Sequence, residues 1–281
     1  MKKISALLLA CVLSFSLVGC GNNGGGDNSS AANGSEVSGK VSLNGSTSME
    51  KLVNGLKEGI VETYPSLQLE PQFTGSSAGI EAVLNGTADI GDVSRALTDE
   101  EKGKGLVENV VALDGIAIVT DSANTATNLT TQQLKDIYTG KIKNWSEVGG
   151  ADQEIVVIGR ESGSGTRDAF EEILDIADQC DLAQTLNETG AVAAAVQSTP
   201  GSIGYISLDA LSDSVKALQL DGVTPSEATI KDQTYTLQRP FVMATKGEVS
   251  EQSEQVQAVF EFIDSDAGQK VISSVGLVSA K

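Results

Sequence analysis

The segment 154–174 limits the possible folds of this chain most, because a strand, a turn and a helix are expected to follow one another within it. Residues 154–158 are mostly β-branched and apolar, which predicts a short buried strand. A turn rich in glycine and serine follows, and the apolar spacing after it predicts a helix with Thr166 at the N-cap position. This order of elements predicts an α/β fold with a polar turn at the end of a strand.

The chemistry of this turn favours an anion. Glycines at 163 and 165 allow the backbone N–H groups to point inward, and the start of the helix adds a partial positive charge. Hydroxyls of Ser164 and Thr166 add further donors, and Arg160 can bind an oxyanion with two parallel hydrogen bonds. The alternative is a flexible surface loop whose serines only cap the helix.

Two further stretches repeat the same pattern. A strand from Lys40 leads into the turn 45–48 and then into apolar residues at helical spacing, and a second strand leads into the turn 74–79 and another helix. A third apolar strand, 88–93, ends in Ser94 and Arg95. Three such helix starts are more than turn chemistry alone would explain, so we expect them to converge on one anion.

Ser48 and Lys51 also match the S-x-x-K pattern of β-lactamases and penicillin-binding proteins. The S-D-N and K-T-G motifs that complete that active site are missing downstream. A serine hydrolase is therefore kept only as an alternative of another class.

The N-terminus predicts export. Two lysines and an apolar run too short for a membrane span predict a signal peptide over 1–20, and the sequence before Cys20 resembles the lipobox of bacterial lipoproteins. Residues 21–39 contain almost nothing that could be buried and predict a flexible tether. The alternative is an ordinary secretory signal with an incidental cysteine.

Composition excludes several classes of function. The chain has no histidine, and Cys180 is the one cysteine outside the signal region, so a usual zinc site, a histidine triad and an intramolecular disulfide are not expected. Its formal net charge of −19 argues against nucleic acid as a partner. Anion binding must then depend on donors that converge locally in a closed cleft.

The motifs together resemble the phosphate-binding lipoproteins of ABC transporters, the PstS family. The resemblance covers nearly all of the chain after the tether, and the motifs that carry it are 45–48, 75–79, 88–91 with Ser94 and Arg95, 160–166, and the strand containing Tyr205. It implies the class II fold of periplasmic binding proteins, in which two α/β lobes with mixed sheets close on the ligand. Residues 40–119 with 239–281 would form lobe I, and 120–238 lobe II, joined by a two-segment hinge.

The resemblance also implies a function. The chain would be an extracytoplasmic receptor, anchored to the cell membrane by a lipid such as palmitate at Cys20, that delivers inorganic phosphate to an ABC permease as a monomer. No catalysis, cofactor or metal would be needed. The phosphate-binding residues carried over are Thr47, Ser48, Ser76, Ser94, Arg95, Arg160, Ser164, Gly165 and Thr166.

One position departs from the family. Many relatives have an aspartate where this chain has Ser94, and that carboxylate accepts the proton of phosphate and excludes sulfate. Asp114 is the first candidate to replace it, followed by Asp92 and Glu161, although a solvated or ion-paired carboxylate is the commoner situation. A receptor for sulfate or molybdate therefore remains an alternative, as does an adhesion or signalling protein with a vestigial cleft.

Three large side chains near these motifs have competing interpretations. Arg95 contacts the ligand or pairs with a nearby acid such as Asp92 or Asp99. Arg167 is expected to pair with acids on its own helix, and Trp145 to pack in the core.

Overall fold

The structure is a computed structural model that describes residues 37–281. The predicted signal peptide, Cys20 and most of the predicted tether lie outside these residues. Within residues 37–281, each helix is too short or too polar to cross a membrane. The first strand begins at Gly39, next to the predicted start of the folded part at Lys40.

A single curled, mixed sheet runs through the described part of the chain, with the strand order β2-β1-β3-β11-β4-β8-β6-β7. Its strands are β1 (Gly39–Gly45), β2 (Leu67–Phe73), β3 (Ile90–Val93), β4 (Leu106–Thr120), β6 (Val156–Arg160), β7 (Gln184–Leu186), β8 (Ser202–Ser207) and β11 (Gln238–Lys246). The short strands β9 (Lys216–Ala217) and β12 (Val278–Ser279) both pair with β4, and β5 (Asn128–Leu129) pairs with β10 (Gln219–Leu220).

Helices cover the sheet. The α-helices are α1 (Glu50–Thr63), α2 (Ser76–Leu84), α3 (Asp99–Gly103), α4 (Thr131–Tyr138), α5 (Gly165–Ile173), α6 (Thr189–Ser198), α7 (Glu227–Lys231), α8 (Glu254–Asp264) and α9 (Asp266–Ser274). Single 3₁₀ turns are η1 (Thr47–Met49), η2 (Trp145–Val148), η3 (Leu208–Ala210) and η4 (Val249–Glu251).

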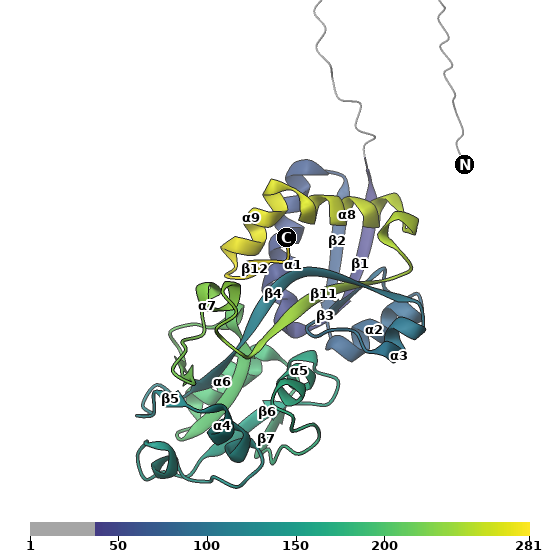
Figure 1. Ribbon diagram of the computed structural model, residues 1–281. Helices are drawn as coiled ribbons and strands as arrows, with labels where there is room; N and C mark the ends of the chain where they lie inside the picture. The colour runs from purple at the N-terminus through teal and green to yellow at the C-terminus, as the bar shows by residue number, and fades with distance from the viewer. Residues whose placement is uncertain (1–36) are drawn as a thin grey trace, which may run out of the picture. The chain divides into compact units, whose positions relative to one another are not determined.

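The strand β4 joins two lobes (Figure 1). Its first part pairs with β11, from Leu106 opposite Lys246 to Gly115 opposite Gln238 with a bulge at Val111, and its last five residues pair with β8. We call the part with β1–β3, α1–α3, α8 and α9 the first lobe, and the part with β5–β10 and α4–α7 the second lobe. Residues 115–120 of β4, in the second lobe, are apolar or β-branched and wholly buried, whereas its first half is partly exposed.

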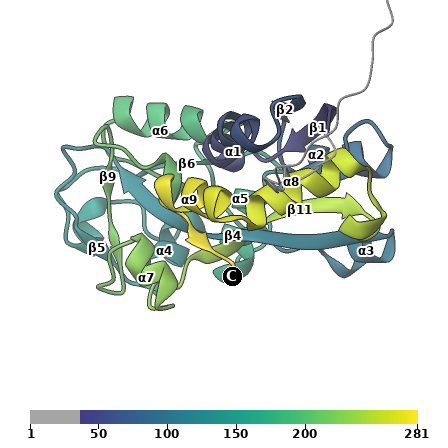
Figure 2. The ribbon, with the colours of Figure 1, turned by 90° about the horizontal axis from the view of Figure 1, so that it is seen from above.

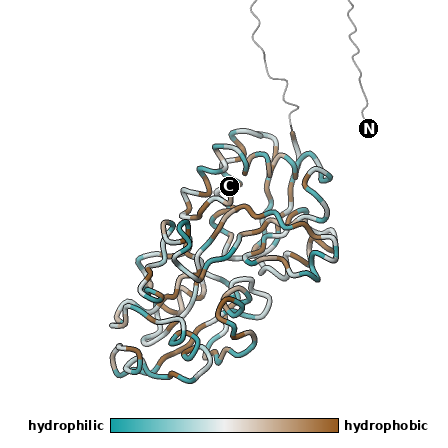
Figure 3. Tube along the Cα trace, in the orientation of Figure 1, coloured by the Kyte–Doolittle hydropathy of each residue, from teal (hydrophilic) through white to brown (hydrophobic). Residues whose placement is uncertain are grey.

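Each lobe has its own hydrophobic core. In the first lobe, the predicted helical face Met49, Leu52, Val53, Leu56 and Ile60 packs with Val259, Phe260 and Ile263 of α8. In the second lobe, Trp145 is buried among apolar residues and donates its indole N–H to the Gly201 carbonyl at 2.8 Å, as expected of a core residue. Figure 3 shows hydrophobic segments along the strands and hydrophilic ones toward the outer helices and loops.

Four helices begin just after the carboxyl end of a parallel strand. β1 leads into η1 and α1, β2 into α2, β6 into α5 and β7 into α6. In α/β sheets this edge is where ligands bind. Figure 2 shows α1 and α6 along the same side of the molecule, so helix starts from both lobes face one region.

Candidate functional site

The first turn places two hydroxyls at the start of α1. Ser46 caps η1, since its Oγ accepts a hydrogen bond from the Ser48 N–H at 3.2 Å, and both Thr47 and Ser48 are buried. Gly45, with φ +151°, lies so close to β3 that a Cβ at this position would overlap the Asp92 carbonyl oxygen. The glycine therefore allows the turn to sit directly against the neighbouring strand.

The second turn adds a buried cluster of serines. Ser94 Oγ accepts a hydrogen bond from Ser46 Oγ at 2.8 Å, and the Ser94 N–H donates to Ser76 Oγ at 3.2 Å. Ser76 is the first residue of α2. Gly165, from the second lobe, packs against this cluster, because a Cβ there would overlap Ser76 Oγ and lie 2.9 Å from Ser94 Oγ.

The third turn starts α5 two residues earlier than expected. Ser164 is the N-cap, accepting from the Arg167 N–H at 3.4 Å, so the prediction of Thr166 as N-cap is wrong. Thr166 instead lies inside the first turn, and its Oγ1 is 2.6 Å from Ser48 Oγ in the other lobe. Arg167 pairs with Glu171 at 2.6 Å, as predicted for an arginine within the helix.

The guanidinium of Arg160 is unusual in this region because it is buried without an acidic partner in the described part of the chain. It is 2% exposed, and its guanidinium donates to the carbonyls of Leu186 and Asn187 and to Thr189 Oγ1, at 2.9–3.2 Å. Among residues 37–281 no carboxylate lies within ion-pair distance of it. Burial lowers the pKa of Arg160 to about 10, so the group stays a cation that lacks a direct counter-ion.

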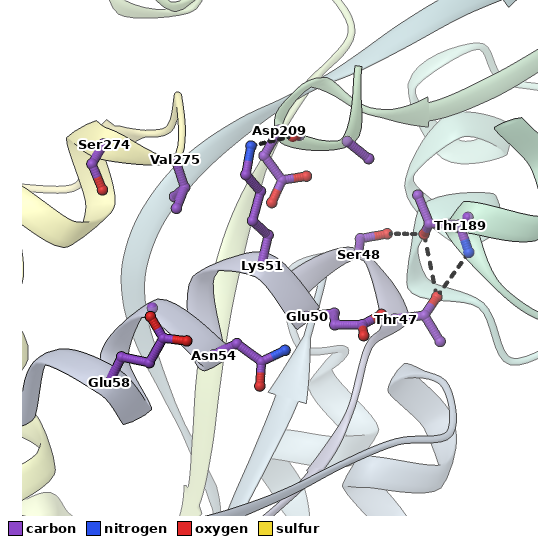
Figure 4. A pocket seen from close by; sticks show the side chains of 13 residues that line it. Thr47, Ser48, Glu50, Lys51, Asn54, Glu58, Thr189, Asp209, Ser274 and Val275 are labelled. Carbon is purple, nitrogen blue, oxygen red and sulfur yellow. Dashed lines mark hydrogen bonds between the residues drawn. The ribbon is translucent and has the colours of Figure 1, made fainter. Parts of the chain in front are cut away.

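A fourth helix start, which the sequence analysis missed, completes the arrangement (Figure 4). Thr189 begins α6, and its Oγ1 lies 3.2 Å from Thr47 Oγ1 and 3.0 Å from Ser48 Oγ. Its N–H donates to Thr47 Oγ1 at 3.2 Å. We call Thr47, Ser48, Thr166 and Thr189, together with Arg160, the cross-lobe cluster.

The signal for α6 was weak in the sequence. Thr189 and Gly190 begin the helix, but the six residues after them are all alanine or valine, so the helix shows no clear polar face. Because β7 before it has only three residues, the strand–turn–helix pattern was not recognisable.

Asp114 forms a buried ion pair with Arg239. After Thr189, Arg239 is the second residue near the site that the sequence did not reveal. Arg239 Nε and Nη2 lie 3.0 and 2.9 Å from Asp114 Oδ2, and both side chains are inaccessible to solvent. Asp114 Oδ1 accepts from Ser207 Oγ and the Leu208 N–H. Burial raises the pKa of Asp114, and Arg239 opposes that shift. Since both oxygens have partners, the contacts do not favour Asp114 as a ligand acceptor, and that role stays a prediction.

The other two acids considered differ in burial. Glu161 is exposed, whereas Asp92 is wholly buried and neither of its carboxyl oxygens has a hydrogen-bond partner in the described part of the chain. Burial raises the pKa of Asp92 well above its usual range, because the ionised form would lose its hydration. The Ser46 N–H donates to the backbone carbonyl of Asp92 at 2.7 Å, so the backbone of this residue lies against the first turn.

Arg95 has partners other than those expected. Its guanidinium lies 2.9 Å from Glu101 of α3 and 3.0 Å from Asp168 of α5, and it also donates to the Ala96 carbonyl. Arg95 therefore forms an ion pair between the lobes, with neither Asp92 nor Asp99. These contacts leave it one free donor hydrogen at most, so they do not favour a ligand contact, which stays a prediction.

The residues of the S-x-x-K pattern do not meet. Ser48 Oγ contacts the hydroxyls of Thr166 and Thr189, while Lys51 Nζ donates to the Asp209 carbonyl at 3.0 Å. A Ser–Lys nucleophile requires the amine to lie within hydrogen-bond reach of the hydroxyl. No such contact is found among residues 37–281.

Comparisons with known proteins agree with this geometry. A family model described as a PBP superfamily domain matches residues 30–267. The phosphate-binding protein PstS of Bacillus subtilis is 34% identical over 89% of this chain and 86% of that protein, and PstS of Borreliella burgdorferi is 29% identical over 86% and 90%.

Solved structures give the same result. A Clostridium perfringens protein named as a phosphate ABC transporter substrate-binding protein, with bound phosphate, has a TM-score of 0.83 and 39% identity, covering 86% of this chain and 100% of that chain. An ABC-type phosphate transport receptor from Vibrio cholerae has a TM-score of 0.72 and 34% identity over the same shares. The chain therefore belongs to the PBP superfamily and, within it, to the PstS family of phosphate-binding proteins.

Proposed function

We propose that this protein is the receptor of an ABC transporter, that it captures inorganic phosphate between its two lobes, and that it delivers the ion to a membrane permease. The observation that carries the proposal is Arg160, a buried cation without a carboxylate partner beside hydroxyls from both lobes. A buried charge is costly unless it is paired. An oxyanion would supply the missing negative charge.

The donor set matches a tetrahedral ion. The hydroxyls of Thr47, Ser48, Thr166 and Thr189 come from three helix starts and converge with the guanidinium. We propose that Ser76, Ser94, Ser164 and Gly165 support this set from the turns beside it. Hydrogen bonds to a charged group contribute about 1.5–3 kcal/mol each, so a few of them are enough for micromolar binding, about −8 kcal/mol.

Selectivity against sulfate requires an acceptor for the proton that phosphate carries. Asp114 and Asp92 are the two buried candidates, and Asp92 is the one with unoccupied oxygens. We propose that one of them makes this discrimination. Comparable binding of sulfate and phosphate would favour the alternative, a general receptor for tetrahedral oxyanions.

We further propose that the lobes divide near the boundaries expected from the sequence, 40–119 with 239–281 and 120–238. The support is that β4 passes from one hydrophobic core to the other. Val111 and Ala112 pack in the core of the first lobe, whereas Ile116 and Ile118 pack in the core of the second. A hinge through β4 and β11 would let the bound anion hold the lobes together.

The location follows from the N-terminal sequence. We propose that the chain is exported, lipidated at Cys20 and held outside the cytoplasm as a monomer, with the tether giving reach to the permease. Binding and release need no covalent step, and the separation of Lys51 from Ser48 supports a receptor over a serine hydrolase. Failure to hydrolyse a chromogenic β-lactam would agree with this view.

The test is calorimetric titration of protein freed of carried-over anions, with phosphate and then sulfate. The Arg160→Gln variant should bind phosphate at least about 100-fold more weakly, because it loses the charge and two or more strong hydrogen bonds. Arg167→Gln, in the first turn of α5 and paired with Glu171, is the matched control and should change affinity little. Unchanged affinity in Arg160→Gln would overturn the proposal.

A further inference from the structure

A second buried guanidinium lies beside the anion site. Arg239 of β11 is 3% exposed, and its Nη1 donates to the Ser94 carbonyl at 3.1 Å. Ser94 Oγ in turn accepts a hydrogen bond from Ser46 Oγ of the first turn. Burial is the main cause of the lowered pKa of Arg160, and the positive charge of Arg239 adds to that shift. An anion bound at Arg160 therefore lies within the electric field of both guanidinium groups.

The guanidinium of Arg239 is not fully satisfied. Its Nε donates to Asp114 Oδ2 at 3.0 Å, and its Nη1 donates to Ser94. Its Nη2 lies 2.9 Å from the same carboxylate oxygen but meets no acceptor with hydrogen-bond geometry in the described part of the chain. A buried donor without an acceptor is costly, and a negative charge in the adjoining site would lower this cost.

Asp114 sets how much of the charge of Arg239 reaches the site. Its Oδ2 contacts Arg239, while its Oδ1 accepts from Ser207 Oγ at 2.8 Å and from the Leu208 N–H at 3.2 Å. These bonds hold the buried carboxylate against the guanidinium. Opposite charges this close cancel much of each other's field at a distance. Arg160 therefore supplies most of the arginine charge that an anion experiences.

Asp209 of η3 is the neighbour whose charge changes with pH. Burial, and secondly the charge of Asp114, raise its pKa to about 7, and Arg239 opposes the shift. Figure 4 shows its side chain beside Lys51, which donates to the Asp209 carbonyl at 3.0 Å. Asp209 is thus ionised in mild alkali, where it also weakens the field of Arg239. Two further ionisable side chains near the pair have raised pKa values and stay neutral, the buried phenols of Tyr205 and Tyr235.

We propose that Arg239 is the second cation of the anion site and that Asp114, by pairing with it, limits how strongly the site prefers a doubly charged oxyanion over a singly charged one. Asp114 then determines specificity through Arg239, without touching the ligand. The inference rests on the proposed function, because it needs an oxyanion at the cross-lobe cluster. It deepens that function, because phosphate is a monoanion in mild acid and a dianion in mild alkali, whereas sulfate is a dianion in both.

The preference between the two forms of phosphate can be measured directly. Phosphate is mostly the monoanion at pH 5.5 and mostly the dianion at pH 8.5, so the ratio of its dissociation constants at these values reports that preference. Calorimetric titration of the purified protein, freed of carried-over anions, gives both constants. Because Asp209 titrates within this interval, Asp209→Asn serves as the parent protein for the other variants.

Removing the charge of Asp114 should change the ratio. In the parent protein, Asp114→Asn keeps the size of the side chain and leaves Arg239 without its counter-charge. An added positive charge attracts a dianion more than a monoanion, so we expect the ratio to shift at least about tenfold toward the dianion. Asp121→Asn is the matched control and should leave the ratio of the parent unchanged. Asp121 is also buried and bonded to backbone N–H groups, but it lies beyond the C-terminal end of β4.

A double variant separates an effect through Arg239 from a contact with the ligand. Asp114→Asn combined with Arg239→Gln replaces both members of the buried ion pair by neutral side chains, which is tolerated better than the loss of one member. The added charge is then gone, so the ratio should return to that of the parent. A direct contact between Asp114 and phosphate predicts instead that the ratio stays shifted.

Asp209→Asn compared with the native protein keeps the proposal testable if Asp114→Asn does not fold. This change removes the negative charge that Asp209 acquires near Arg239 at high pH, so the variant should favour the dianion more than the native protein does. In that case, the absence of such a shift would overturn the proposal.

The outcomes separate the two claims. Phosphate binding with an unchanged ratio in Asp114→Asn would overturn the inference alone, and so would a shift that survives in the double variant or appears equally in Asp121→Asn. A native protein that binds no phosphate at either pH would overturn both the inference and the proposed function.

Discussion

Gly165 illustrates how a single missing side chain sets the distance between the lobes. A Cβ at this position would overlap Ser76 Oγ of the first lobe. The first turn of α5 can therefore approach the serine cluster this closely only if residue 165 is glycine. Unlike Gly45 or Gly75, it has no positive φ, so alanine suits its backbone. The constraint therefore acts between the lobes, and the helix itself would tolerate the change.

A Gly165→Ala variant should accordingly lose anion affinity by about tenfold or more while its melting temperature without ligand changes little. The methyl group keeps the lobes from closing fully, and one lost hydrogen bond of about 1–1.5 kcal/mol corresponds to that factor. Calorimetry and thermal unfolding measure the two quantities. Gly190→Ala, at the start of α6 with nothing within 4 Å of an added Cβ, is the control. Equal affinities for both variants would contradict the explanation.

Asp92 should make stability depend on pH. Its pKa is raised in the folded protein, so the unfolded chain ionises first, and folding stability falls as pH rises from the usual carboxyl range toward the raised pKa. Asp92→Asn removes this dependence. As pH rises through that window, the free energy of unfolding of the variant should increase relative to that of the native protein by up to about 1.4 kcal/mol per pH unit.

Urea unfolding at pH 5 and pH 8 measures the difference for Asp92→Asn and for Asp213→Asn, an exposed acid that should show no such trend. A difference between Asp92→Asn and the native protein that stays constant with pH would mean that Asp92 is ionised in the fold. Phosphate and sulfate titrations of the same variant, alongside Asp114→Asn, compare the two candidate acceptors.

At the scale of elements, α3 and α5 are tied across the lobes by Arg95. Asp168→Asn removes the ion pair between Arg95 and α5 and keeps the ion pair between Arg95 and Glu101. Because Asp168 is about one-third exposed, the pair should contribute about 0.2–1 kcal/mol, which predicts phosphate release up to about fivefold faster. Stopped-flow dissociation measures the rate, and raised salt should shrink the difference.

Glu172→Gln, an exposed acid on the same helix, should release phosphate at the native rate. If Asp168→Asn also does so, then the ion pair does not resist opening of the lobes.

The elements were predictable wherever apolar spacing and turn chemistry agreed. The helix with Met49 and Leu52 and the strand before Arg160 were predicted from local pattern, and the structure contains both as α1 and β6. Contacts set by register could not be predicted. Arg239 meets Asp114 across 125 residues of sequence only because β11 pairs with β4, and no local signal marks that partnership.

For the whole molecule, bound anion should act as a clamp between two bodies with separate cores. At a free concentration 1,000 times its dissociation constant, phosphate would stabilise the fold by about 4 kcal/mol. For a protein of this size we expect the melting temperature to rise by roughly 8 °C or more. Sodium sulfate at equal ionic strength serves as the control in the same thermal scan, and an equal rise with sulfate would contradict selective binding.

The position of β11 between β3 and β4 also fixes the order in which the chain can be assembled. The second lobe is nearly continuous in sequence, so its sheet does not depend on the last part of the chain. The first lobe has a gap in the middle of its sheet until residues 238–246 arrive, although β1–β3 were made long before. We therefore expect the sheet of the first lobe to be completed late, because the edges of β3 and β4 that face β11 stay unpaired until then. We expect the lobe that holds the first strands of the chain to be the one that completes its sheet last.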